Sequence, residues 1–242
     1  GDEMKKVRVI AALAMVLSLL IVPEPLAGTW VKQGDNWKYR NDAGKYEASN
    51  WIEDNGAWYY IESDGFMKKG WLQEESGNWK YLDYETGALI PDAYKGWDNK
   101  TFINRKLDYQ ITLPDDYHIV TERDATELPG ENNSFDFITI SSDGKSVVSV
   151  IELGIPATWG YELSTSELAE VLKSLYKCEA ETSEVTYNDW NLSKLPFSVE
   201  DGSVLEYYFG KYEDNIMMIE VIYPEGGWEK AHNILQTLKR PR

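Results

Sequence analysis

Aromatic residues recur at a regular interval between Gly28 and Gly96, and this recurrence is the strongest pattern in the chain. Trp30, Trp51 and Trp71 follow one another at spacings of 21 and 20 residues. A second tryptophan follows each of them after seven or eight residues, at Trp37, Trp58 and Trp79. A period near twenty residues is typical of a stacked repeat and not of an ordinary globular core.

Each repeat has the pattern of a β-hairpin. In the first repeat a Trp-Lys-Tyr strand at residues 37–39 leads into a glycine-containing turn at 41–44, and the other repeats keep this order. Aromatic strands beside such turns indicate hairpins, and a single hairpin is marginally stable in water. Stacking removes the aromatic faces from water, which stabilises by ~25 cal/mol per Å2 of apolar area. We therefore predict a β-hairpin solenoid of about three repeats over residues 28–100, with 96–99 as a degenerate fourth repeat or a cap.

From residue 101 onward the pattern is that of a second domain. Alternation of apolar and polar residues over 107–113 predicts a half-buried strand. Similar runs predict six more strands, at residues 135–141, 146–153, 183–187, 192–199, 204–212 and 216–223. The predicted fold class is thus mainly β and α+β, with an α+β sandwich around an antiparallel sheet over residues 101–242.

Two helices are predicted in this second domain. Ser164 and Glu167 have the spacing of a capping box at a helix start. The expected buried stripe of that helix consists of Leu168, Val171, Leu172 and Leu175. The last helix carries its apolar face on Trp228, Ala231, Leu235 and Leu238.

The first 27 residues have the features of an export signal. Residues 1–3 read as an expression scar or an overlong start, and a basic stretch at 5–8 precedes an apolar run at 9–22. Small residues near Ala27 are suitable for cleavage. We expect residues 1–27 to be a signal peptide and the protein to be secreted and cell wall-associated. The alternative is an uncleaved anchor, for which the run is shorter than the usual ~20 apolar residues.

Charge and composition exclude several functions. The net charge of −17 argues against non-specific nucleic-acid binding, which depends on basic patches. It either attracts cationic ligands or only keeps the protein soluble. Cys178 is the single cysteine, which excludes an internal disulfide, and the two histidines are His118 and His232. We therefore expect no metal site and no cofactor.

The repeat resembles the cell-wall-binding, or choline-binding, repeat of Gram-positive surface proteins. The resemblance lies in residues 70–74 followed by 77–81, and in residues 50–51 with 56–60 and 64–67. It implies a wall-polymer ligand: the choline of teichoic acid or, as in a close relative of the repeat, a glucan or other glycan. A quaternary ammonium group has no hydrogen-bond donor and is held by aromatic faces, which this stretch supplies.

The same resemblance implies which residues bind. The first aromatic cage consists of Trp30, Trp37 and Tyr59. The second contains Trp51 and Trp58, but Lys80 stands at its tyrosine position, so this cage requires Tyr81 or Tyr84 to substitute. Trp71 and Trp79 are not followed by a full repeat, so a third cage is not expected. The alternative is that these aromatic residues form only the core of the solenoid.

The second domain carries a fainter resemblance. Residues 107–117 are similar to the start of Mog1/PsbP-like domains, which implies an α/β/α sandwich that binds protein partners without catalysis; an unrelated α+β sandwich is the alternative. No catalytic residue is predicted, because Cys178 lies in no Cys-His motif. Asp136, Glu152 and Glu220 are interpreted as solvent-facing strand residues. The competing hypothesis is a small wall hydrolase that uses an acid pair of this domain.

Overall fold

A computed structural model describes residues 28–120, 135–153, 163–199 and 201–242. The expected signal peptide, residues 1–27, lies outside these ranges. The chain forms two compact units. The first contains the described residues up to Lys68 together with Gly87–Leu89, and the second contains Lys69–Thr86 and the described residues from Ile90 to Arg242.

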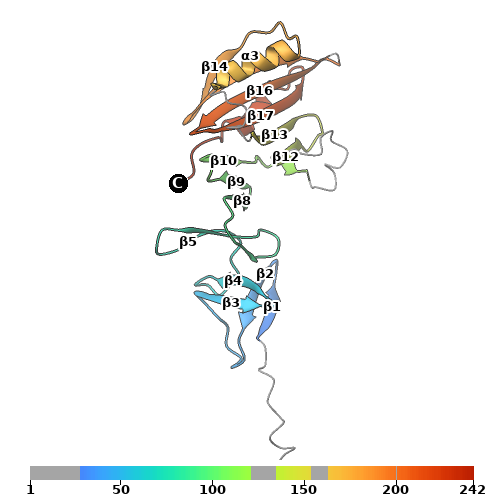
Figure 1. Cartoon of the computed structure of the whole chain (residues 1–242). Helices are drawn as coiled ribbons and strands as arrows, with labels where there is room; N and C mark the ends of the chain where they lie inside the picture. Colours follow the sequence, from blue (N-terminus) through green and yellow to red (C-terminus); the bar gives the residue numbers. More distant parts are fainter. Residues whose placement is uncertain (1–27, 121–134, 154–162, 200) are drawn as a thin grey trace, which may run out of the picture. The chain divides into compact units, whose positions relative to one another are not determined.

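Two β-hairpins build the first unit (Figure 1). β1 (Thr29–Gln33) pairs with β2 (Asn36–Arg40), and β3 (Asn50–Asp54) pairs with β4 (Ala57–Ile61), both antiparallel. Asn55 and Gly56 form the turn of the second hairpin, with φ angles of 51° and 80°. Two positive φ angles in a two-residue turn match the twist of the flanking strands, and the Asn-Gly pair adopts them readily.

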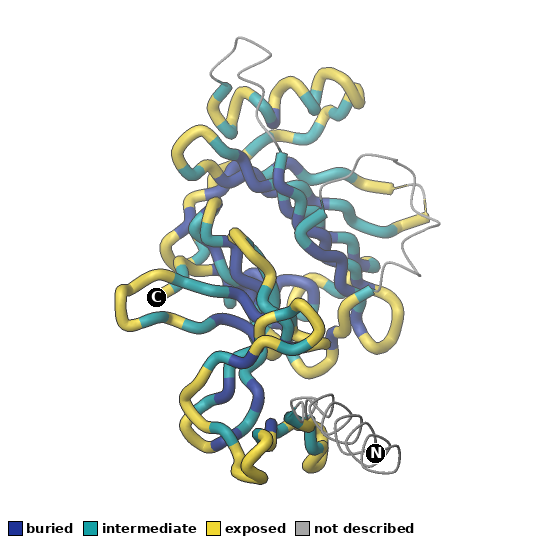
Figure 2. The backbone as a smooth tube through the Cα atoms, turned by 60° about the horizontal axis from the view of Figure 1, so that its bottom comes forward, coloured by how far each residue is buried: buried dark blue, intermediate teal, exposed yellow. Residues whose placement is uncertain are grey.

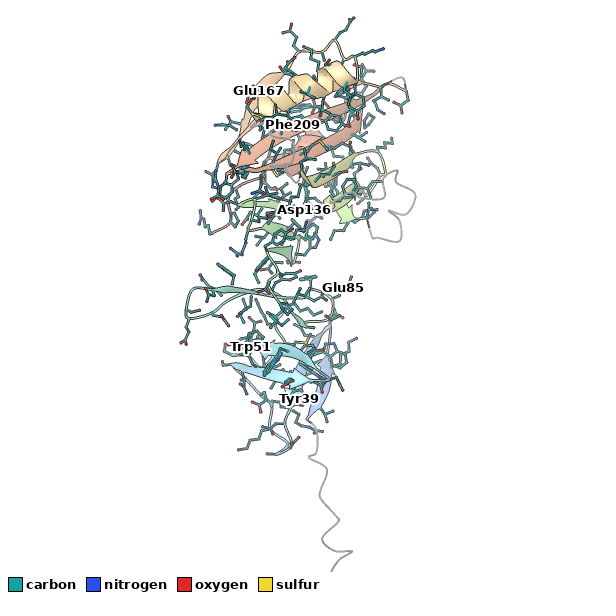
Figure 3. All side chains as sticks on the ribbon, viewed as in Figure 1. Tyr39, Trp51, Glu85, Asp136, Glu167 and Phe209 are labelled. Atoms are coloured by element: carbon teal, nitrogen blue, oxygen red, sulfur yellow. The ribbon has the colours of Figure 1, made fainter. Side chains whose placement is uncertain are left out.

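The hairpins of the first unit share one small core. Its buried members are Tyr39, Ile52, Ile61 and Met67, which come from different hairpins and from the chain after β4, and Trp30 and Tyr59 pack against them. Figure 3 labels Tyr39 and Trp51 on these strands. A core shared between successive hairpins is the packing that the repeat predicts.

The second unit begins with a third hairpin and a three-stranded meander. β5 (Gly70–Gln73) and β6 (Trp79–Leu82) form the hairpin, and β7 (Leu89–Ile90), whose two residues are divided between the units, continues its sheet. The meander consists of β8 (Lys95–Asp98), β9 (Thr101–Asn104) and β10 (Tyr109–Thr112). The expected boundary at residues 100–101 coincides with the turn between β8 and β9, and it stays a prediction.

A seven-stranded antiparallel sheet forms the body of the second unit. Its order is β11-β12-β13-β17-β16-β15-β14. The strands are β11 (Tyr117–Ile119), β12 (Phe135–Ser141), β13 (Val147–Leu153), β14 (Ser183–Tyr187), β15 (Trp190–Ser198), β16 (Ser203–Tyr212) and β17 (Asn215–Pro224). The six strands predicted after residue 134 are confirmed within two residues at each end. The structure thus confirms the predicted α+β class, and Figure 2 shows buried positions concentrated along the sheet.

Each face of the sheet is covered by a different layer. α3 (Thr165–Leu175) contacts β15 and β16, whereas α4 (Trp228–Leu235) contacts β17 and β10. Phe209 packs in the cluster beneath α3, and its neighbour Tyr208 packs in the cluster with α4. Successive strand residues point to opposite faces, so the two helices lie on opposite sides of the sheet. Neither helix of the described ranges is long and apolar enough to span a membrane.

The capping box of α3 is confirmed, but the predicted buried stripe is partly wrong. The Ser164 hydroxyl accepts a hydrogen bond from the Glu167 backbone N–H, and the Glu167 carboxylate accepts from the Ser164 backbone N–H. Ala169 is fully buried, whereas Val171 and Leu175 are 51% and 69% exposed. At 100° per residue, the face centred on Ala169 turns these two side chains away from the sheet. Leu168 and Leu172 flank that face and pack against the core as predicted.

The terminal helix follows its prediction with one exception. Ala231, Leu235 and Leu238 are fully buried, although the helix itself ends at Leu235. Trp228, predicted on the same face, is 52% exposed. It is the first residue of the helix, and its ring stacks on that of His232, with ring centroids 4.5 Å apart.

Candidate functional site

Two tryptophans lie on the same face of the first hairpin. The β1–β2 register places Trp30 opposite Tyr39 and Lys32 opposite Trp37. Alternate residues share a face of a strand pair, so Trp30 and Trp37 are diagonal neighbours, roughly 7–8 Å apart across the pair. That spacing suits a small methylated ammonium ion, which binds ring faces within about 6 Å of their centroids.

Trp30 is the inner ring of this site. Its centroid lies 5.0 Å from that of Tyr39 and 5.0 Å from that of Tyr59, both in edge-on geometry. Its indole N–H donates a hydrogen bond to the Asp54 carboxylate at 3.1 Å. The structure therefore brings Trp30 and Tyr59 together, and it adds a negative charge at the edge of the ring.

Trp37 is the outer, accessible ring. It is 36% exposed, and its carbonyl oxygen accepts a hydrogen bond from the Met67 N–H at 2.8 Å, which fixes β2 in the shared core. The Lys32 ammonium lies 5.9 Å from the centroid of the Trp37 ring. A cation of the chain itself is thus already close to the face that a cationic ligand would use.

The second hairpin repeats this arrangement with the opposite charge. Trp51 lies opposite Tyr60, with ring centroids 5.2 Å apart, and Trp58 lies opposite Glu53. Trp58 is 44% exposed. Trp51 and Trp58 are therefore diagonal neighbours as well, with a carboxylate where the first hairpin has Lys32. Lys32 and Glu53 were not predicted from the sequence, although the hairpin register identifies each as the residue five positions before its outer tryptophan.

Tyr81 belongs to a different environment from Trp51 and Trp58, because it lies in the second compact unit and they lie in the first. It is 6% exposed, and its hydroxyl accepts from the Trp97 N–H at 2.9 Å and donates to the Trp97 carbonyl at 3.1 Å. Burial raises the pKa of this hydroxyl to about 12. A Cβ atom on Gly96 would lie 2.2 Å from the ring of Tyr81, so only glycine permits this packing. That Tyr81 binds the ligand stays a prediction. Its ring would have to become exposed for a ligand to reach it.

The choline-binding repeat family matches residues 48–94, which contain β3 to β7. This segment includes the diagonal pair Trp51–Trp58 and the equivalent pair Trp71–Trp79. The chain carries choline-binding repeats. The β1–β2 hairpin precedes the matched segment and has the same register of diagonal tryptophans.

Solved structures similar to this chain include two choline-binding proteins and a PsbP protein. The choline-binding domain of Spr1274 from Streptococcus pneumoniae is 34% identical over 25% of this chain and 80% of that domain, with a TM-score of 0.23. CbpJ from Streptococcus pneumoniae TIGR4 is 28% identical over 31% of this chain, with a TM-score of 0.26, and the chain spans 25% of its length. The cyanobacterial PsbP protein of Synechocystis sp. PCC 6803 is 11% identical over 58% of this chain and 91% of that one, with a TM-score of 0.39. A search of curated proteins found no match.

Outside the choline-binding repeats, two acids predicted to face solvent are buried. The Asp136 side chain is fully buried and accepts hydrogen bonds from Lys95 at 2.6 Å, from Asn104 at 2.8 Å and from the Tyr109 hydroxyl. Glu152 is 6% exposed and pairs with Lys95 and with Lys106. The prediction was wrong because strand alternation does not show that the β8–β10 meander supplies partners for these carboxylates. Both acids are held in ion pairs (Figure 3 labels Asp136).

A second buried polar cluster joins β15, β16 and α4. The Glu206 carboxylate lies 2.6 Å from the Lys194 ammonium, 2.6 Å from the Tyr208 hydroxyl and 2.8 Å from His232 Nε2. Burial alone would raise the pKa of Glu206, but hydrogen bonds from His232, Lys194 and Tyr208 lower it to about 2. Tyr208 is fully buried, and Glu206 and His232 are 3% and 2% exposed. These groups are satisfied by one another and covered from solvent.

The remaining candidate residues lie apart from these clusters. His118 is exposed on the edge strand β11. The Cys178 thiol is half-buried, with its sulfur 3.6 Å from the Pro196 carbonyl oxygen. Within the described ranges no group of three or more His, Cys, Asp or Glu side chains has the arrangement of a metal site.

Proposed function

We propose that the protein is an exported surface protein whose hairpins hold the choline of wall teichoic acid, or a related wall polymer, between diagonal tryptophan pairs. The observation that carries the proposal is the repeated geometry of Trp30–Trp37 and Trp51–Trp58. In each pair the inner ring is half-buried and fixed, and the outer ring is more than a third exposed. One fixed face and one accessible face are what a quaternary ammonium group needs.

Charge supports a cationic ligand over an anionic one. The chain has a net charge of −17, which raises the local concentration of cations at its surface. Asp54 accepts a hydrogen bond from the Trp30 indole, and Glu53 lies opposite Trp58. Each pair therefore has a carboxylate beside a ring, where it strengthens binding of an ammonium group.

The proposal assigns binding to the repeats and gives the second domain a partner-binding role without catalysis. The buried acids of this domain support that assignment. Asp136, Glu152 and Glu206 are each paired with lysine and covered from solvent, whereas glycoside hydrolysis needs two carboxylates that reach a substrate. The test is the turbidity of a wall suspension. A flat trace supports a binding protein, and a falling trace contradicts the non-catalytic assignment.

Retention on isolated Gram-positive walls tests the wall-binding proposal. The protein should remain on choline-containing walls and elute with free choline. Ethanolamine at the same concentration should leave it bound, because its primary ammonium is more strongly hydrated and lacks the methyl groups that contact the rings. The double variant Trp37→Ala, Trp58→Ala should not be retained.

The same variants separate choline from the carbohydrate alternative. If the protein binds a glucan matrix and free choline does not displace it, the ligand of the aromatic faces is a sugar ring and not choline. Failure to bind either matrix by a folded protein would contradict the binding proposal as a whole.

A further inference from the structure

The third hairpin has the same diagonal tryptophans as the first two, but its inner ring is closed off. Trp71 lies opposite Tyr81, and Trp79 lies opposite Gln73. The two tryptophan centroids are 6.4 Å apart, with their planes at 84°. Trp71 is only 4% exposed. This hairpin therefore has the same tryptophan pair as the other two, but its inner ring is shielded from solvent.

The side chain of Arg105, which follows β9, contacts both rings, and Tyr81 and Ile103 pack against Trp71 in the same cluster. The central carbon of its guanidinium lies 3.7 Å from the Trp79 centroid and 4.7 Å from the Trp71 centroid. Both distances are well within the ~6 Å range of a cation–π contact. The Arg105 backbone N–H donates to the Tyr94 carbonyl at 2.7 Å, which fixes the residue at this position. One cation thus contacts both rings of the pair.

The rings are the principal compensation for this charge. Arg105 Nε is buried and has no hydrogen-bond partner among the described residues. Burial lowers the pKa of the guanidinium, and the charge of Asp108 offsets part of that effect, while Asp108 itself forms an ion pair with Arg240. A polar atom buried without a partner is costly. Contact with two aromatic faces is the favourable interaction that offsets it.

We propose that the Trp71–Trp79 pair is a latent site for a quaternary ammonium group, closed in the protein by its own Arg105 guanidinium. A guanidinium and a trimethylammonium group share a single positive charge and weak hydration, and both bind the faces of aromatic rings. The third hairpin is thereby joined to the rest of the second unit. The choice of ligand rests on the proposed function of the other two pairs; the occupancy by Arg105 rests on the geometry alone.

Opening the site by Arg105→Ala tests the proposal. The probe is choline, and its heat of binding is measured by isothermal titration calorimetry. The measurement uses a Trp37→Ala, Trp58→Ala background, so that only the third hairpin keeps its tryptophan pair. The parent background should give no saturable heat, and adding Arg105→Ala should produce a saturable binding step that a further Trp79→Ala removes. The matched control is Arg40→Ala, which removes the same charge from an exposed position on β2 and should produce no such step.

A folded Arg105→Ala protein with no added binding would overturn the latent site. This failure is distinct from failure of the proposed function, which is measured by the Trp37- and Trp58-dependent binding of the unmodified chain. If Arg105→Ala does not fold, nuclear magnetic resonance of the unmodified chain tests whether Arg105 lies against the two rings. The Arg105 Nε–H signal should then be shifted upfield by the ring currents and exchange slowly with water. A signal at the position of a solvent-exposed arginine would overturn the occupancy.

Discussion

Glu206→Gln should destabilise the second unit by a margin set by the surroundings of the carboxylate. The substitution keeps the size and shape of the side chain and removes its charge. The Lys194 ammonium at 2.6 Å then loses its anionic partner. Tyr208 and His232, at 2.6 and 2.8 Å, face a neutral amide in place of a carboxylate.

The pKa of Glu206 gives the size of the effect. Hydrogen bonds from its neighbours, working against burial, move it from an ordinary 4.5 to about 2 in the folded protein. Lowering the pKa from 4.5 to about 2, at 1.36 kcal/mol for a tenfold change in proton affinity, corresponds to about 3 kcal/mol of folding stability at neutral pH. A loss of that size is typical when one partner of a buried ion pair is removed.

The sign of the pH dependence follows from the direction of the shift. Because folding lowers the pKa, the stabilisation is complete above 4.5 and is lost as the pH falls toward 2. The difference between wild type and Glu206→Gln should therefore be greatest at neutral pH and smaller by about 2 kcal/mol at pH 3.

Urea denaturation of both proteins at pH 7 and at pH 3 is the assay. Glu225→Gln is the matched control, because Glu225 is exposed in the turn after β17 and its substitution should change stability by less than about 0.5 kcal/mol. A loss below about 1 kcal/mol for Glu206→Gln at pH 7 would show that the Glu206 carboxylate does not stabilise the fold through its buried partners. So would a difference that stays the same at both pH values.

Two further predictions concern the hairpins and the start of the second domain. Lys32→Gln should strengthen choline binding a few-fold in a fluorescence titration, because it removes the ammonium 5.9 Å from the Trp37 ring, and Glu53→Gln should weaken it. Unchanged affinity in both would contradict a cationic ligand at these rings. A fragment of residues 101–242 should unfold at a lower urea concentration than a fragment of residues 69–242, because it leaves the buried Asp136 without Lys95. Its free energy of unfolding should be smaller by on the order of 3 kcal/mol. Equal stability would support residue 101 as an independent folding boundary.

Much of the fold was predictable because its signals are local. The spacing of tryptophans predicted the hairpins, and the period-two pattern of 107–113 predicted a strand that the structure has at Tyr109–Thr112, with Tyr109 and Ile111 fully buried. The capping box at Ser164 is confirmed because both of its hydrogen bonds lie within one helical turn. Such features depend on neighbours in the sequence and need no knowledge of the tertiary structure.

Features that depend on distant partners were missed. Asp136 is buried because Lys95 and Asn104 reach it from the meander. No local sequence pattern predicts these contacts. The face of α3 is set by Ala169 packing on the sheet, which displaced Val171 and Leu175 to the surface. Arg105 lies 26 residues beyond Trp79 in the sequence, so its contact with the pair is visible only in the folded chain.

The indole N–H signals of the protein, followed by nuclear magnetic resonance during a choline titration, test the central claim most directly. The Trp30, Trp37, Trp51 and Trp58 signals should shift saturably with choline and not with ethanolamine. The Trp71 signal should stay in place because Arg105 covers its ring. Choline-independent signals for all four tryptophans in the folded protein would contradict the claim that the hairpins hold a quaternary ammonium group.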